Sequence, residues 1–166
     1  MLKLFRKRSV LNKSAHVYRA AGALIFVSNH EAPNGIKFFA APIIRLPGSA
    51  EDSNIGESIR KVLGAYKKHK NTSELPDDMK AYMKGILKEM GFRSWKALES
   101  PPTQICSITA SADTITFKLM QIGLTQKDSE SARTADVEPV TLSAGSNNSE
   151  LGTALINTFN HHQDRT

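Results

Sequence analysis

A repeated strand–turn–helix pattern is the feature that most constrains the fold of this chain. Residues 45–63 (RLPGSAEDSNIGESIRKVL) and 141–159 (TLSAGSNNSELGTALINTF) align without a gap. Each copy has a short extended run, then a turn rich in Gly, Ser, Asn and Asp, then an amphipathic helix. Two copies are too few for a solenoid. The repeat therefore predicts two equivalent units, and the alternative is chance, because a polar turn before an amphipathic helix is common.

Gly56 and Gly152 occupy the same place in the two predicted helices. A glycine inside a helix costs about 1 kcal/mol relative to alanine. Helical spacing puts each glycine at the edge of its apolar stripe. We expect both helices to pack on the same sheet, with each glycine allowing a neighbouring backbone to approach closely.

Local patterns along the rest of the chain predict further strands and helices. Period-two or β-rich runs predict strands, and apolar residues at i, i+3, i+4 predict helices. The predicted strands are 16–28, 36–46, 103–110, 113–123 and 137–142, and the predicted helices are 53–70, 76–91, a short one starting at Ser94, and 149–160. Hairpins dominate and no βαβ alternation occurs. The fold class is therefore α+β, a mostly antiparallel sheet of about five strands packed with three to four helices in a single domain.

Several residues predict local details of these elements. Gly22 indicates a bend or bulge within the first strand, and Pro42 indicates an edge position or a bulge in the second. Asn34-Gly35 between them is a hairpin signal. The basic residues 67–70 fall in the last turn of the helix predicted over 53–70, where cations suit the helix dipole.

Length and composition suit one globular domain. The chain has 166 residues, of which 40% are hydrophobic and 23% charged, which argues against global disorder. A single cysteine cannot form an intramolecular disulfide, as in a reducing compartment. The basic start lacks a signal-peptide core, and no apolar run reaches membrane-spanning length. We expect a cytoplasmic protein with a flexible N-terminus at residues 1–13, one domain at 14–162 and a frayed tail at 163–166.

Motifs that carry chemistry are absent from the sequence. It has no Walker loop, no GxGxxG and no GxSxG, and its five histidines form no metal-ligand spacing. Cys106 lies among Ile105 and Ile108 in a predicted strand, a setting typical of a small buried residue. We predict no catalytic residue, no metal and no cofactor. An enzyme that uses Cys106 remains an alternative at this stage.

The net charge of +6 is unevenly distributed. Residues 1–100 carry 18 Lys and Arg against 9 Asp and Glu, whereas residues 101–166 carry 4 against 7. A basic first part can attract nucleic acid or an acidic protein. Scattered lysines on helices also form an ordinary solvated face, so both interpretations stay open.

Several segments, which together cover most of the chain after Phe38, form a recognisable series. They are Leu46-Pro47 with the polar turn and IGESIRKVL, then GFRSWKALES, ICSI before ITF, and the closing VTLSAGSNNSELGTALINTF. Taken together they resemble the bacterial contact-dependent growth inhibition immunity proteins. The resemblance implies a protein that binds and blocks the toxin domain of a large surface-delivered effector, often a nuclease. It implies no catalytic residues. The chain departs from the acidic character expected of a protein that plugs a basic nuclease site.

The segment 127–138 is the first candidate for the partner-binding surface. It is long for a connection in a compact domain, and such segments are either functional or disordered. Its acidic residues, followed by those near the helix starts, are the predicted contacts with a basic toxin surface: Asp128, Glu130, Asp136, Glu138, Glu51, Asp52, Asp77 and Asp78. The rival hypothesis is a small basic nucleic-acid-binding protein. The sequence makes no prediction about homo-oligomers, and it predicts no membrane partner.

Overall fold

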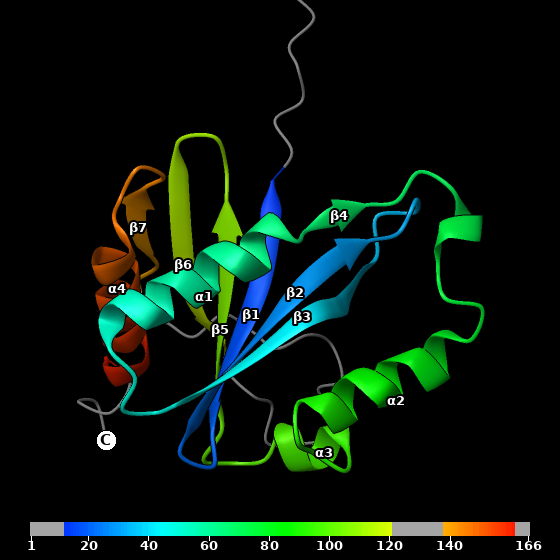
Figure 1. The fold of residues 1–166 in the computed structure, drawn as a ribbon, viewed down its shortest axis with the longest axis horizontal. Coiled ribbons are helices and arrows are strands. Elements are labelled where there is room, and N and C mark those ends of the chain that lie inside the picture. The colour runs from blue at the N-terminus through cyan, green and yellow to red at the C-terminus, as the bar shows by residue number, and fades with distance from the viewer. Residues whose placement is uncertain (1–11, 121–137, 162–166) are drawn as a thin grey trace, which may run out of the picture.

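One antiparallel sheet with helices on both faces forms the fold (Figure 1). The computed structural model describes residues 12–120 and 138–161. The strands are β1 (Lys13–Ala20), β2 (Ala23–Glu31), β3 (Lys37–Pro47), β4 (Lys67–Lys68), β5 (Gln104–Ala110), β6 (Thr114–Met120) and β7 (Val140–Ser143). The helices are α1 (Asp52–Gly64), the 3-10 turn η1 (Thr72–Glu74), α2 (Met79–Glu89), α3 (Trp95–Leu98) and α4 (Asn148–Asn160).

The strand order across the sheet is β3-β2-β1-β5-β6-β7, with the two-residue β4 beside the end of β2. Every pairing is antiparallel except the one between β4 and β2. The predicted α+β class with a mostly antiparallel sheet is confirmed. Within the described residues the sheet has seven strands rather than about five.

Two units of the same order build this sheet. The first is β1-β2-β3-α1 and the second is β5-β6-β7-α4, and they meet where β1 pairs with β5 at the centre. Each helix follows an edge strand and folds back over the same face of the sheet. This arrangement explains why the repeated pattern occurs twice in the sequence. The core on this face includes Val17, Leu24, Phe26, Ile55, Ile59, Cys106, Ile108, Phe117, Leu151, Leu155 and Phe159.

The two repeated glycines lie where α1 crosses α4. A methyl group on Gly56 would overlap the backbone carbonyl of Asn148, and one on Gly152 would overlap the carbonyl of Asp52. Asp52 and Asn148 are equivalent positions of the repeat, so the two contacts are reciprocal. The prediction that each glycine faces a neighbouring backbone on a shared sheet is confirmed.

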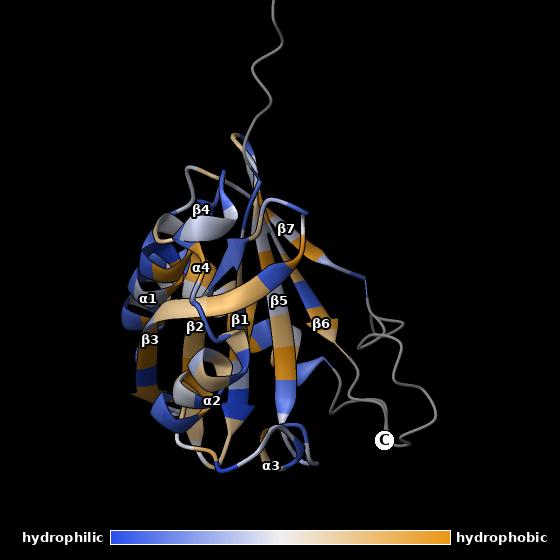
Figure 2. Ribbon diagram, turned by 90° about the vertical axis from the view of Figure 1, so that its right-hand side faces the viewer, coloured by the Kyte–Doolittle hydropathy of each residue, from blue (hydrophilic) through white to orange (hydrophobic). Residues whose placement is uncertain are grey.

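Helices α2 and α3 cover part of the opposite face. Ile86 and Leu87 of α2, and Met90 just after it, are buried there, together with Tyr18, Ile25, Val27, Leu98 and Ile105. Asp78 caps α2 and Ser94 caps α3 through their side-chain oxygens. Figure 2 shows hydrophobic and hydrophilic residues alternating along β6, which directs Ile115, Phe117 and Leu119 to the core on the α1–α4 face.

The run 16–28, predicted as one strand, is a hairpin. β1 ends at Ala20 and β2 begins at Ala23, and the two loop residues Ala21 and Gly22 have positive φ angles of 50° and 71°. Two positive φ angles are what a tight two-residue hairpin needs. The prediction was wrong because an alanine in a left-handed conformation costs about 1–2 kcal/mol and leaves no mark in the sequence. The Asn34-Gly35 turn and the edge position of Pro42 are confirmed.

The helix predicted over 53–70 ends at Gly64. After it, Lys67 and Lys68 form β4, which lies beside His30 and Glu31 of β2. β1 pairs with β2 only as far as Ser28, so β4 takes the place that β1 leaves free. The lysines are therefore strand residues and do not compensate a helix dipole.

Three predicted segments lie wholly or largely outside the described residues. They are the basic N-terminus, the segment 127–138 except Glu138, and the C-terminal tail. No helix in the described ranges is long and apolar enough to cross a membrane.

Candidate functional site

The predicted acidic residues do not form one patch in the described part of the chain. Glu51 and Asp52 lie at the start of α1, which packs on one face of the sheet, whereas Asp77 and Asp78 precede α2 on the other face. Glu138 is exposed just before β7. Asp128, Glu130 and Asp136 lie outside the described residues.

Two of these carboxylates stabilise the fold itself. The Asp52 Oδ2 atom accepts a hydrogen bond from Thr153 Oγ1 at 2.7 Å, which links the first turn of α1 to α4. The Asp78 Oδ1 atom accepts from the backbone N–H of Ala81 at 3.0 Å, which caps α2. Mutations at these two positions would therefore change the helices as well as any surface contact.

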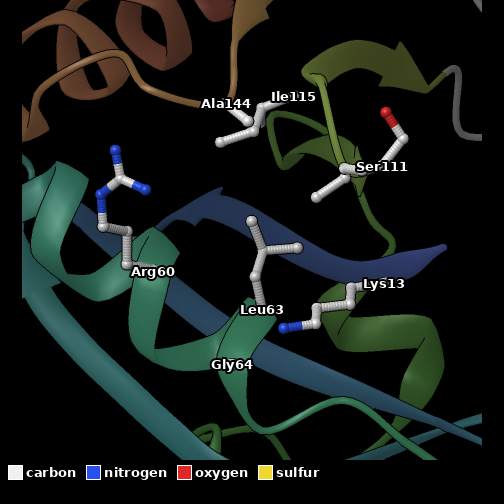
Figure 3. A pocket seen from close by; sticks show the side chains of 9 residues that line it. Lys13, Arg60, Leu63, Gly64, Ser111, Ile115 and Ala144 are labelled. Atoms are coloured by element: carbon white, nitrogen blue, oxygen red, sulfur yellow. The ribbon is translucent and has the colours of Figure 1, made fainter. Parts of the chain in front are cut away.

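A hollow of about 330 Å³ lies between the end of α1, the β5–β6 hairpin and the turn before α4 (Figure 3). Its charged residues are both basic, Arg60 of α1 and Lys13 of β1, and in this view they lie on either side of Leu63. Arg60 already donates from Nε to Asn148 Oδ1 at 3.0 Å and from its guanidinium to the Ser146 carbonyl. None of its lining residues is acidic, so the charge around the hollow is positive.

A ridge of three lysines runs along the outer side of α2. Lys80, Lys84 and Lys88 are exposed and follow i, i+4, i+8 spacing, so they share one face of the helix. None of the ion pairs among the described residues involves them. Like charges at i, i+4 destabilise a helix by about 0.2–0.5 kcal/mol per pair. The i, i+4, i+8 spacing of these lysines can be seen in the sequence, but the same spacing also occurs on an ordinary solvated helix face.

A chain of titratable side chains ties the segment after α1 to the end of β2. His30 Nε2 lies 3.1 Å from the Ala65 carbonyl, His30 Nδ1 lies 3.0 Å from His69 Nε2, and His69 Nδ1 lies 3.2 Å from Glu74 Oε2. The Ala65 carbonyl only accepts, so His30 carries its hydrogen on Nε2 and accepts from His69 on Nδ1. His69 is buried and stacks on Phe38, with 5.8 Å between ring centroids.

The environment of this histidine chain disfavours a charge on His30. Burial, followed by the positive charge of His69, lowers the pKa of His30 below its ordinary value. Beside it, Glu31 accepts a 2.5 Å hydrogen bond from the Tyr66 hydroxyl and lies 3.2 Å from Lys68 Nζ. The hydrogen bond from Tyr66, then the one from Lys68, lowers the pKa of Glu31. These contacts fix the connection between α1 and α2.

Cys106 does not have the environment of a nucleophile. Its side chain is buried in the core between α4 and the sheet, and burial raises the pKa of the thiol to about 12. A thiolate is needed for attack, and this pKa leaves almost none at neutral pH. The predicted role as a small buried residue is confirmed. Among the described residues, no three His, Cys, Asp or Glu side chains are grouped as metal ligands.

Comparison with known proteins finds similarity in structure. No protein-family model matches the chain, and no curated protein matches its sequence. A protein of unknown function from Neisseria meningitidis superposes with a TM-score of 0.69 at 14% identity, over 91% of this chain and 95% of the other. A chain of the CdiA-CT/CdiI toxin and immunity complex from Yersinia pseudotuberculosis superposes with a TM-score of 0.59 at 14% identity, over 90% and 97%. The protein therefore shares its whole fold with both.

Proposed function

We propose that this protein is an immunity protein of a contact-dependent growth inhibition system. It binds the toxin domain of a cognate surface-delivered effector in the cytoplasm and blocks it non-covalently. The observation that carries the proposal is the likeness, over nine-tenths of the chain, to a chain of a toxin and immunity complex. The segments quoted from the sequence resemble the same immunity family, although no family model matches the chain.

The chemistry of the described residues supports binding rather than catalysis. The thiol of Cys106 is sealed in the core and stays protonated. The polar contacts of His30 with His69 and with the Ala65 carbonyl hold β2 to the segment after α1, and Asn29 Nδ2 of β2 donates to Ser14 Oγ of β1 at 3.0 Å. Exposed charged residues lie on helices, strands and loops, and such charges can guide association with a charged partner.

The test is protection of cells from the toxin. The C-terminal toxin domains of the contact-dependent growth inhibition effectors of the source strain are induced one at a time in a bacterial host, with and without this chain, and growth is followed. We expect growth arrest without the chain, full growth with it, and a complex of the two purified proteins in gel filtration. If the toxin is a nuclease, the nucleic acid of arrested cells is degraded and the chain prevents this. Growth arrest despite equal expression of the folded chain would contradict the proposal.

The rival nucleic-acid-binding function has its own measurement. Binding of the purified protein to bulk RNA and DNA is measured by fluorescence anisotropy across a range of salt concentrations. Micromolar affinity that falls steeply with salt, together with no binding to the toxin domain, would favour the rival. We expect no more than weak binding, lost at physiological salt.

A further inference from the structure

The outer surface of α2 contains a glycine that the fold does not require. Gly85 lies in the middle of the helix and is exposed. A methyl group at this position would meet no atom within 4 Å, and Gly85 does not have the positive φ that would strain another residue. Glycine weakens a helix relative to alanine, and nothing in the described structure compensates for this loss.

The surroundings of Gly85 form a shelf edged by positive charge. Ala81, one turn before Gly85, is also exposed, so a strip of small residues runs beside the lysine ridge Lys80, Lys84 and Lys88. The ridge spans about 12 Å along the helix. The apolar side of α2 faces the sheet, where Ile86 and Leu87, with Met90 just after the helix, are buried and Tyr82 packs half-buried beside them. The outer side therefore has two features that destabilise the free helix. One is a glycine that the packing does not need. The other is a row of three lysines, none of which takes part in an ion pair within the described residues.

Residues that lower the stability of the free protein are expected at surfaces where a second molecule binds, because binding can compensate for the lost stability. A glycine lets a partner backbone approach the helix, and the lysines supply charge for an acidic surface. We propose that the lysine ridge and the shelf at Ala81 and Gly85 are the docking surface for an acidic face of the toxin domain. This inference rests on the proposed immunity function and adds where the toxin binds and what charge it presents.

The ends of the ridge favour a protein over a nucleic acid as the partner. Asp77 and Asp78 precede the ridge and Glu89 follows it, and all three are exposed. These carboxylates repel a continuous phosphate backbone that would extend past the ridge. A protein surface, in contrast, can place acidic side chains on the lysines and basic ones opposite the carboxylates.

The first experiment removes the charge of the ridge. A triple variant with Lys80→Gln, Lys84→Gln and Lys88→Gln is compared with a control that loses the same charge elsewhere, Lys61→Gln, Lys70→Gln and Lys118→Gln. Association with the purified toxin domain is measured by surface plasmon resonance at low and at physiological salt. We expect the ridge variant to associate at least about tenfold more slowly at low salt, with a flatter salt dependence, and the control to stay within about twofold of the wild type.

The second experiment separates stability from binding. Gly85→Ala is compared with Gly64→Ala, another exposed helical glycine whose added methyl would meet no atom. We expect both variants to melt at or above the wild-type temperature, and only Gly85→Ala to dissociate from the toxin domain several-fold faster. Such a result cannot come from damage to the fold.

The outcomes distinguish this inference from the proposed function. If the wild type binds the toxin domain and neither the ridge variant nor Gly85→Ala changes the kinetics, the docking surface is wrong and the immunity function stands. If the wild type does not bind the toxin domain, the proposed function fails first. If the ridge variant keeps its toxin kinetics but loses affinity for duplex DNA of mixed sequence, the ridge is a nucleic-acid contact, and the inference is overturned.

Discussion

At the scale of single residues, Gly56 and Gly152 determine how closely α1 and α4 approach. We expect Gly56→Ala to lower the free energy of unfolding by about 1–3 kcal/mol or more, because its methyl group overlaps a backbone carbonyl that cannot move without shifting the first turn of α4. Urea denaturation measures this change. Gly64→Ala is the control, with a gain of up to about 1 kcal/mol. Equal stability of the two variants would contradict the crossing as described.

A second residue-scale prediction concerns the pH dependence of stability. The pKa of His30 is lowered in the folded protein, so the unfolded chain binds more protons near its ordinary value of about 6.5. The contribution of His30 to the free energy of unfolding is therefore fully present above about pH 6.5. It is lost as the pH falls from there to the lowered pKa of His30 in the folded protein. Burial lowers the pKa of His16 in the same direction. We expect His30→Gln to reduce the slope of the free energy of unfolding against pH in this range. The slope that remains comes from His16.

The control for this pH experiment is the exposed His161, which follows α4. His161→Gln should leave the stability profile between neutral pH and about pH 5 unchanged. If His30→Gln also kept the wild-type slope, the histidine chain would not be coupled to folding.

The contacts of the two glycines could be predicted from the sequence, whereas the contact between the two histidines could not. The glycines were identifiable because the same residue recurs at the same place in two amphipathic helices. The contact between His30 and His69 was not, because it depends on the pairing of β4 with β2 across 39 residues of sequence. No local pattern reports a parallel pairing of two residues.

At the scale of elements, the connection from α1 to α2 depends on a few polar contacts. The Tyr66 hydroxyl donates to Glu31 at 2.5 Å, and the backbone N–H of His69 donates to the Glu31 carbonyl at 2.8 Å. Tyr66→Phe removes only the first contact. We expect it to cost about 1.5–3 kcal/mol, the range for a hydrogen bond to a charged group, and to speed amide hydrogen exchange around β4. Unchanged exchange at Lys67–Lys68 would show that strand pairing alone holds this segment.

Helix α2 shows what a sequence pattern reports about an element and what it omits. Its stripe, its Asp78 cap and its end before Gly91, whose φ is +91°, follow from local chemistry. The predicted end of α1 was wrong because residues 65–70 continue a helical pattern, whereas β2 offers them a strand position. Tertiary pairing outweighs local propensity there.

At the scale of the whole molecule, the fold class follows from the sequence and is confirmed, whereas the binding surface stays a prediction. Each half of the sheet is built from local patterns, and the repeat relates the halves. A partner surface depends on a second molecule, so charge alone suggested the acidic residues. In the structure two of these, Asp52 and Asp78, serve helix contacts, and the largest exposed series of like charges on one helix face among the described residues is the lysine ridge.

The two core clusters should unfold together, because they share the same strands. Neighbouring residues such as Val17 and Tyr18 of β1 point into opposite clusters. Trp95, the only tryptophan, packs beside Phe39 on the α2 face, with 5.8 Å between ring centroids. Its fluorescence therefore reports on the face opposite to Gly56.

We expect the Trp95 fluorescence and the far-ultraviolet circular dichroism of the wild type to change at one urea midpoint, and Gly56→Ala to lower both by the same amount. The glycine lies on the far side of the sheet from the fluorophore, so only loss of the shared strands can carry its effect to Trp95. A fluorescence midpoint that stays at the wild-type value while the dichroism midpoint falls would mean that the α2 face unfolds as a separate unit. In that case the docking surface proposed on α2 would be expected to survive partial unfolding of the α1–α4 face.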